Sequence, residues 1–175
     1  MNLSGKSIGF RGDVRRDFAS RLVASTDNSI YQIVPEVGVM PRDADDVRRL
    51  MRLLGRQQFR HVTASPRGGG TGTNGQSLCD GVLVDLSRWM TRIVERDDSG
   101  AWVRVEPGIV LDQLNAALRP EGVFFAPSLS PANRATLGGM IATDAAGKGS
   151  RVYGKTSDHV LELTTVLLGG ETIVT

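Results

Sequence analysis

The chain has 175 residues, enough for one ordinary domain or two small lobes, and 21 basic against 19 acidic residues give a net charge of +2. Because the two signs are interspersed, the charge does not indicate nucleic-acid binding. No apolar run approaches the roughly 20 residues needed to span a bilayer, and residues 1–6 lack the apolar core of a signal peptide. Cys79 is the single cysteine, which excludes an internal disulfide or a multi-cysteine metal site, and we expect a cytoplasmic protein.

Residues 1–34 are predicted to form a helical and extended lead-in. Apolar residues at helical spacing predict a helix over 13–25, with Asp13 as its N-cap. Residues 29–40 are expected to be extended. Pro35 and Pro41 confine any strand there to a sheet edge or to short pieces.

The clearest predicted helix covers residues 44–56. Asp43 is its expected N-cap, Asp46 completes a pattern that resembles a capping box, and Gly55 is the expected stop. A strand at 61–64, a second strand at 82–86 and a hairpin pairing 93–96 with 102–106 should follow. Together these elements predict a βα unit followed by short strands.

The second half is expected to open with a helix over 111–118, ended by Pro120 and Gly122. A strand is predicted at 123–126. Small residues over 135–144 favour a short helix whose first N–H groups would be free to bind an anion. A polar loop at 147–154 and a hairpin over 160–174 would complete an α+β fold.

The most informative part of the sequence is the Gly-rich segment, residues 66–76, where five of eleven residues are glycine. Glycine weakens helices and strands, so such a run indicates a backbone conformation or a close approach that other residues do not allow. It lets successive N–H groups turn into a concave nest that binds phosphate oxygens, and the diphosphate of a dinucleotide is the expected ligand. The alternative is a surface loop, but Thr71, Thr73, Asn74 and Gln76 add hydrogen-bonding side chains that a linker does not need.

Three other motifs of ligand binding or catalysis are excluded by the residues around them. Gly70, Gly72 and Gly75 have the spacing of a Rossmann fingerprint, but no apolar helix follows them. Residues 147–150 lack the residue order of a P-loop. His61 and His159 form no local metal motif or catalytic triad, so both are interpreted as structural.

Five separated motifs, in order and spacing, resemble the PCMH-type FAD-binding domain of the FAD-linked oxidases. They lie at residues 66–71, in the strand ending at Asp85, and at 105–108, 135–139 and 152–161. The resemblance covers residues 35–175. Within that superfamily the chain looks most like the bacterial D-2-hydroxyglutarate or D-lactate dehydrogenases with a C-terminal iron–sulfur domain, and residues 25–31 strengthen this narrower match.

The resemblance implies a two-lobed fold in which residues 35–107 form the first FAD-binding lobe and 108–175 an incomplete second lobe. It implies a diphosphate cradle at Arg67, Gly68, Gly69, Gly70, Thr71, Gly72, Thr73, Asn74, Gly75 and Gln76. It implies a flavin side at Pro127, Ser128, Thr136, Gly138, Gly139, Thr143, Gly147, Tyr153 and Gly154. Relatives with covalent flavin have histidine where Thr71 stands, so FAD should be non-covalent. Many relatives have asparagine where Asp144 stands, and an unpaired carboxylate there would repel the diphosphate.

The implied reaction is oxidation of a D-2-hydroxy acid with hydride transfer to FAD. No catalytic residue or metal ligand can be named in this chain. The substrate contacts and the iron–sulfur cluster would lie in downstream domains, so the chain alone is expected to be inactive. The oligomeric state is left open. The alternatives are a non-redox nucleotide-binding or interaction module, and the FAD domain of another FAD-linked oxidase acting on an alcohol, a sugar lactone or a cell-wall precursor.

Overall fold

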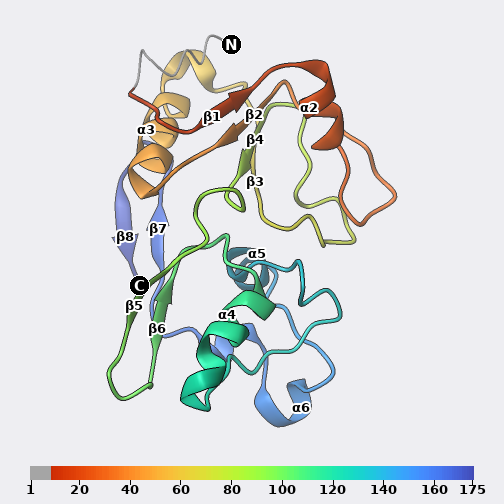
Figure 1. The fold of residues 1–175 in the computed structure, drawn as a ribbon. Coiled ribbons are helices and arrows are strands. Elements are labelled where there is room, and N and C mark those ends of the chain that lie inside the picture. Colours follow the sequence, from red (N-terminus) through yellow and green to blue (C-terminus); the bar gives the residue numbers. More distant parts are fainter. Residues whose placement is uncertain (1–8) are drawn as a thin grey trace.

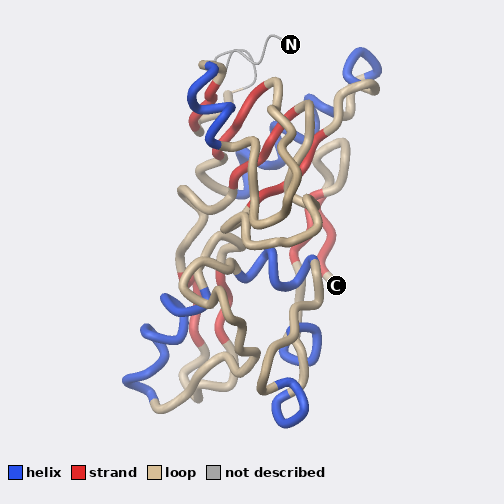
Figure 2. Tube along the Cα trace, turned by 90° about the vertical axis from the view of Figure 1, so that its right-hand side faces the viewer, coloured by secondary structure: helices blue, strands red, loops and turns tan. Residues whose placement is uncertain are grey.

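The computed structural model describes residues 9–175 and has two lobes, one above the other in Figure 1. Each lobe has its own hydrophobic core, built around Val37, Val82 and Leu50 in the first lobe and around Leu111, Leu114 and Met140 in the second. Figure 2 shows the same division from the side. None of the described helices is long and apolar enough to cross a bilayer.

The first lobe is a four-stranded sheet in the order β1-β2-β4-β3, covered by helix α3 (Ala44–Leu54). Its strands are β1 (Asp13–Arg15), β2 (Val37–Met40), β3 (Ala64–Arg67) and β4 (Val82–Asp85). β1 runs antiparallel to β2, whereas β2 and β3 run parallel to β4. The parallel strands read as apolar runs because they are buried. The strand predicted at 61–64 begins only at Ala64, since the 3₁₀ helix η1 (Gln57–Phe59) and a turn come before it.

The lead-in differs from the prediction in its first elements. Residues predicted as the start of a helix form strand β1, and helix α2 (Phe18–Val23) begins later, with Asp17 as its N-cap accepting from the Ser20 amide at 2.8 Å. The prediction of an N-cap at Asp13 is therefore wrong. Of the two alternatives predicted for residues 29–40, the short piece is confirmed: β2 is a central strand of four residues, flanked by Pro35 and Pro41, which do not enter the ladder.

Helix α3 starts as predicted, but without a capping box. Asp43 accepts from the Asp46 amide at 3.0 Å. The fully buried Asp46 carboxylate turns away and accepts from the amides of Arg11 at 3.0 Å and Arg42 at 3.1 Å. Asp46 thus joins the start of the helix to the chain that precedes β1.

The predicted hairpin and helix both form, but the hairpin, which the prediction placed in the first lobe at 35–107, packs Ile93, Val103 and Val105 on the core of the second lobe. β5 (Ile93–Arg96) pairs antiparallel with β6 (Val103–Val105), and α4 (Leu111–Leu118) buries its three leucines. The 3₁₀ helix η2 (Arg119–Glu121) and Gly122 at φ +73° then turn the chain. The strand predicted at 123–126 is wrong, since the Asn115 side chain bonds the Phe125 N–H at 2.8 Å and C=O at 3.2 Å.

The remaining elements are α5 (Leu137–Ala142), α6 (Ser150–Tyr153), the 3₁₀ helix η3 (Thr156–His159) and the antiparallel pair β7 (Thr164–Val166) and β8 (Thr172–Val174). α5 is the predicted short helix, and α6 lies inside the predicted loop. The turn of the terminal hairpin reaches back to the first lobe, where the Gly169 amide bonds the Met51 carbonyl of α3 at 3.2 Å. The hairpin therefore spans both lobes.

Candidate functional site

The Gly-rich segment leaves the end of β3 and packs directly against the second lobe. A Cβ added to Gly68 would lie 2.0 Å from Thr136 Oγ1, and one added to Gly69 would lie 1.9 Å from the Arg134 carbonyl oxygen. No side chain fits in either place. These two glycines allow the backbones of the two lobes to touch.

The backbone of this segment offers a row of unbonded donors. Among residues 9–175, no protein group accepts a hydrogen bond from the amides of Gly68 through Thr73, and residues 68–72 are half-buried. Gly70 at φ +62° and Gly75 at φ +71° turn the chain at positions unfavourable for other residues. The Asn74 amide is occupied by Gln76 Oε1 at 3.0 Å. A run of free, half-buried amides is a receptor for an anion.

A second polar group without a partner lies beside these amides. Thr136 is 3% exposed, and its Oγ1 is buried with no hydrogen-bond partner in the described part of the chain. The atom lies between Gly68 and Gly139, whose added Cβ atoms would be 2.0 Å and 3.4 Å away. An unpaired buried hydroxyl costs roughly 1–3 kcal/mol. A ligand held by the adjacent amides could supply the missing partner.

The first two amides of α5 are not free, so the anion site predicted at the start of this helix lacks two of its expected donors. The Leu137 amide donates to the Ile109 carbonyl at 3.0 Å, and the Gly138 amide donates to the Pro107 carbonyl at 2.8 Å. A Cβ on Gly138 would meet Pro107 Cβ at 2.7 Å. Gly138 therefore packs the helix against the end of the first hairpin and has no free donor.

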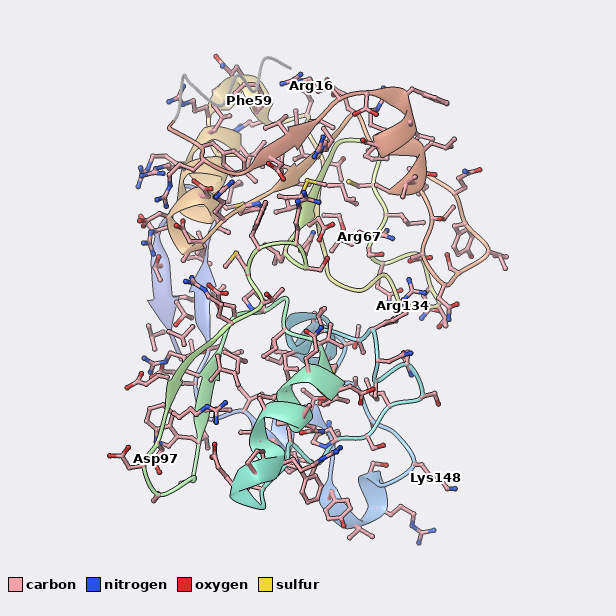
Figure 3. The ribbon with its side chains drawn as sticks, in the orientation of Figure 1. Arg16, Phe59, Arg67, Asp97, Arg134 and Lys148 are labelled. Carbon is pink, nitrogen blue, oxygen red and sulfur yellow. The ribbon has the colours of Figure 1, made fainter. Side chains whose placement is uncertain are left out.

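The Arg67 side chain points to the lead-in. Its guanidinium donates to the carbonyls of Ala24 at 3.3 Å and Thr26 at 2.7 Å (Figure 3). Nearby, Ser77 donates to Asp27 at 3.2 Å, and a Cβ on Gly75 would lie 2.9 Å from the Tyr31 ring. Residues 24–31 thus support the outer side of the Gly-rich segment. The sequence pattern of residues 25–31 strengthens the family resemblance but does not predict this contact.

The other predicted residues lie in the second lobe. A cleft of about 440 Å³, here called the second-lobe cleft, is lined by Pro127, Ser128 and Tyr153 together with Phe124, Phe125, Lys148 and residues of α4. Gly147 lies beside it, since its added Cβ would be 1.5 Å from the Ser128 carbonyl oxygen.

Two of the remaining predicted residues have local roles. The Thr143 hydroxyl is occupied by the Gly139 carbonyl at 3.0 Å. Gly154, at φ +77°, lies against the Asp158 carboxylate. The predicted site is thus two groups of residues, one at the junction of the lobes and one around the second-lobe cleft.

Asp144 is held by an ion pair. It has φ +45°, and its carboxylate contacts the Lys155 ammonium and accepts from the Ser157 amide at 3.0 Å. The hydrogen bond from Lys155, followed by that from Ser157, lowers the pKa of Asp144 to about 2. Its negative charge is therefore compensated.

Neither Cys79 nor His159 has the surroundings of a nucleophile or base. Cys79 is buried, and burial raises the pKa of its thiol. His159 Nε2 lies 2.6 Å from the Tyr153 carbonyl, to which it donates. We therefore interpret both residues as structural.

A two-lobed α+β fold with a row of unbonded amides at the junction of its lobes has the features of a nucleotide-binding domain. The family model described as "FAD binding domain" matches residues 35–175, and the chain belongs to this family. These are the residues over which the sequence resembles that domain. The row of free amides and the unpaired Thr136 hydroxyl fit the diphosphate of FAD.

Relatives of known activity are much longer than this chain. It is 61% identical over 166 residues to D-2-hydroxyglutarate dehydrogenase of Pseudomonas putida. The aligned region covers 95% of this chain and 16% of that protein. The Escherichia coli protein of the same name is 56% identical over 167 residues, with the same two shares. Among solved structures, Physcomitrella patens BBE-like 1 has a TM-score of 0.82 at 21% identity, covering 95% of this chain and 36% of that one. The last match shows the fold alone.

Proposed function

We propose that this chain is the FAD-binding part of a flavin-dependent dehydrogenase that oxidises a D-2-hydroxy acid, with D-2-hydroxyglutarate as the first candidate. The observation that carries the proposal is the row of free amides from Gly68 to Thr73 beside the unpaired Thr136 hydroxyl. The identity to D-2-hydroxyglutarate dehydrogenases over 95% of the chain supports the choice of substrate class.

In this proposal the residues of the chain bind and orient FAD, which supplies the acceptor for a hydride. The backbone of the Gly-rich segment holds the diphosphate, and Thr136 donates to it or to the adjoining part of the dinucleotide. The predicted residues around the second-lobe cleft, Pro127, Ser128, Gly147 and Tyr153, line the flavin side. Thr71 replaces the histidine of covalent relatives, which supports non-covalent binding.

The substrate contacts and an iron–sulfur cluster belong, in this proposal, to other parts of a longer protein. The chain spans about a sixth of the length of the dehydrogenases it matches, and its single cysteine cannot ligate such a cluster. A reducing, cytoplasmic location is part of the proposal and is supported by the absence of a cysteine pair in the sequence.

Flavin binding is tested by titrating the chain with FAD and following the flavin fluorescence, with ADP as a competitor. We expect saturable one-to-one binding that ADP displaces, because the diphosphate is common to both ligands. The FAD must also be released by denaturation, as non-covalent binding requires. A chain that neither quenches nor shifts flavin fluorescence at any concentration would refute the assignment.

The substrate is tested separately by joining the chain to the remaining domains found in the dehydrogenases. We expect D-2-hydroxyglutarate to bleach the flavin absorption of that longer protein and to leave the FAD of the 175-residue chain oxidised. Bleaching by an alcohol or a sugar lactone, with none by D-2-hydroxy acids, would assign the chain to another kind of FAD-linked oxidase.

A further inference from the structure

The strongest unexplained group near the site is the side chain of Arg134. Its backbone is fixed at the junction of the lobes, because its carbonyl lies against Gly69 and its amide donates to the Pro131 carbonyl at 2.9 Å. The residue is exposed, and its guanidinium makes no hydrogen bond or ion pair with the described residues. Figure 3 shows Arg134 at the level where the two lobes meet. The backbone of a cationic residue is therefore fixed beside Gly69, and its side chain has no protein partner among residues 9–175.

Other cations in the neighbourhood are already engaged or lie elsewhere. The Arg67 guanidinium is bonded to the carbonyls of residues 24 and 26, and the Lys155 ammonium is paired with Asp144. Lys148 lines the second-lobe cleft, well below Arg134 in Figure 3. Of these four residues, Arg134 is the one near the Gly-rich segment whose side chain has no hydrogen bond or ion pair with residues 9–175 to break when it turns to a ligand.

We propose that Arg134 is a binding residue for the diphosphate of the dinucleotide, closing over it from the second lobe while the amides of residues 68–73 hold it from the first. This inference rests on the proposed function. A diphosphate has two negative charges, whereas the amides supply only partial positive charges. A guanidinium adds a full charge and can form two parallel hydrogen bonds with phosphate oxygens. It would also make diphosphate binding depend on contact between the two lobes.

The test compares Arg134→Ala and Arg134→Lys with the unaltered chain, and uses Arg60→Ala, an exposed arginine after η1, as the matched control. We expect Arg134→Ala to weaken FAD and ADP binding about tenfold to a hundredfold, the range for a charge-assisted hydrogen bond. Arg134→Lys should recover part of the affinity, since it keeps the charge and loses the paired geometry. Arg60→Ala should bind as the unaltered chain does.

Salt dependence separates this role from a structural one. Between about 50 mM and about 500 mM NaCl, FAD binding by the unaltered chain should weaken more than binding by Arg134→Ala, because the variant has lost one screened charge interaction. Thermal unfolding of the variants should stay near that of the unaltered chain. Equal FAD affinity and equal salt dependence for Arg134→Ala would overturn the role of Arg134 alone, whereas an unaltered chain that binds no FAD would overturn the proposed function as well.

Discussion

At the scale of single residues, Asp144 is stabilised in an uncommon backbone conformation by its carboxylate. Its folded pKa of about 2 lies below the reference value of 3.8, so the ionised form favours the folded state. This contribution is complete above the reference value and is lost as the pH falls towards the folded value. Asp144→Asn removes the charge but keeps an acceptor for the Ser157 amide, and asparagine tolerates positive φ.

We expect Asp144→Asn to be slightly less stable than the unaltered chain at about pH 6, with the difference shrinking towards about pH 3. The pair is exposed, so the effect is small. Urea unfolding at a series of pH values measures it. Lys155→Met should give the same trend, and a difference between Asp144→Asn and the unaltered chain that stays constant with pH would contradict the explanation.

Thr136 provides a residue-scale test in which stability and binding change in opposite directions. Thr136→Val removes the buried, unpaired hydroxyl while keeping the shape of the side chain. We expect the flavin-free chain to gain about 1 kcal/mol of unfolding free energy and FAD binding to weaken, because a ligand partner is lost. Chemical unfolding and a fluorescence titration measure the two effects. Thr165→Val, on the exposed strand β7, should leave FAD affinity unchanged; a loss of stability in Thr136→Val would mean that the hydroxyl is satisfied in the free chain.

At the scale of elements, the junction of helix α3 with the lead-in depends on one carboxylate. Asp46 is fully buried and accepts from the Arg11 and Arg42 amides, and Arg49 Nη1 lies 3.3 Å away. Replacing it leaves two donors without a partner. We expect Asp46→Ala to lower the unfolding free energy by about 2–4 kcal/mol.

Asp45 is the matched control, since it is exposed and its ion pair within residues 9–175 is with Arg48 on the same helix. Asp45→Ala should cost less than about 1 kcal/mol. Urea unfolding of the two variants compares them directly. Similar losses would mean that the contacts of Asp46 with the lead-in do not stabilise the lobe.

The elements that sequence patterns predicted well are those fixed by local periodicity and turn chemistry. Helix α4, the hairpin β5–β6 and the start of α3 at Asp43 are of this kind. The errors come from long-range contacts. β1 forms because β2 offers it a strand edge, the stretch at 123–126 is held by Asn115, and the first amides of α5 are taken by carbonyls more than twenty residues earlier in the sequence.

The same distinction applies to the candidate site. Glycine spacing predicted the Gly-rich segment, because positive φ and close backbone approach leave few other residues possible at Gly69 and Gly70. The orientation of Arg67 towards Ala24 and Thr26, and the free side chain of Arg134, follow from contacts between distant parts of the chain. No local sequence pattern predicts these two side-chain environments. The assignment of individual residues to FAD remains a prediction.

At the scale of the whole molecule, two of the contacts between the lobes lie far apart along the described chain: the Gly-rich segment against residues 134–136, and the terminal hairpin against α3. The first contact forms the proposed diphosphate site. The second contact holds the turn after β7, which contains Gly169 and Gly170, against helix α3. The hairpin should therefore influence FAD binding without touching the cofactor.

Gly170→Ala tests this coupling. Gly170 has φ +86°, and its added Cβ would lie 2.7 Å from the Arg48 carbonyl oxygen of α3, so the turn must move away from the helix. Gly169→Ala is a control in the same turn, since Gly169 also has positive φ, at +109°, but an added Cβ meets nothing within 4 Å. Both variants pay roughly 1–2 kcal/mol for positive φ, and only Gly170→Ala also loses the contact with α3. We expect Gly170→Ala to be the less stable variant, to expose β7 and β8 to faster amide hydrogen exchange, and to bind FAD more weakly than Gly169→Ala does. Equal FAD affinity of the two variants would mean that the contact between the Gly-rich segment and residues 134–136 holds the lobes in place without the hairpin.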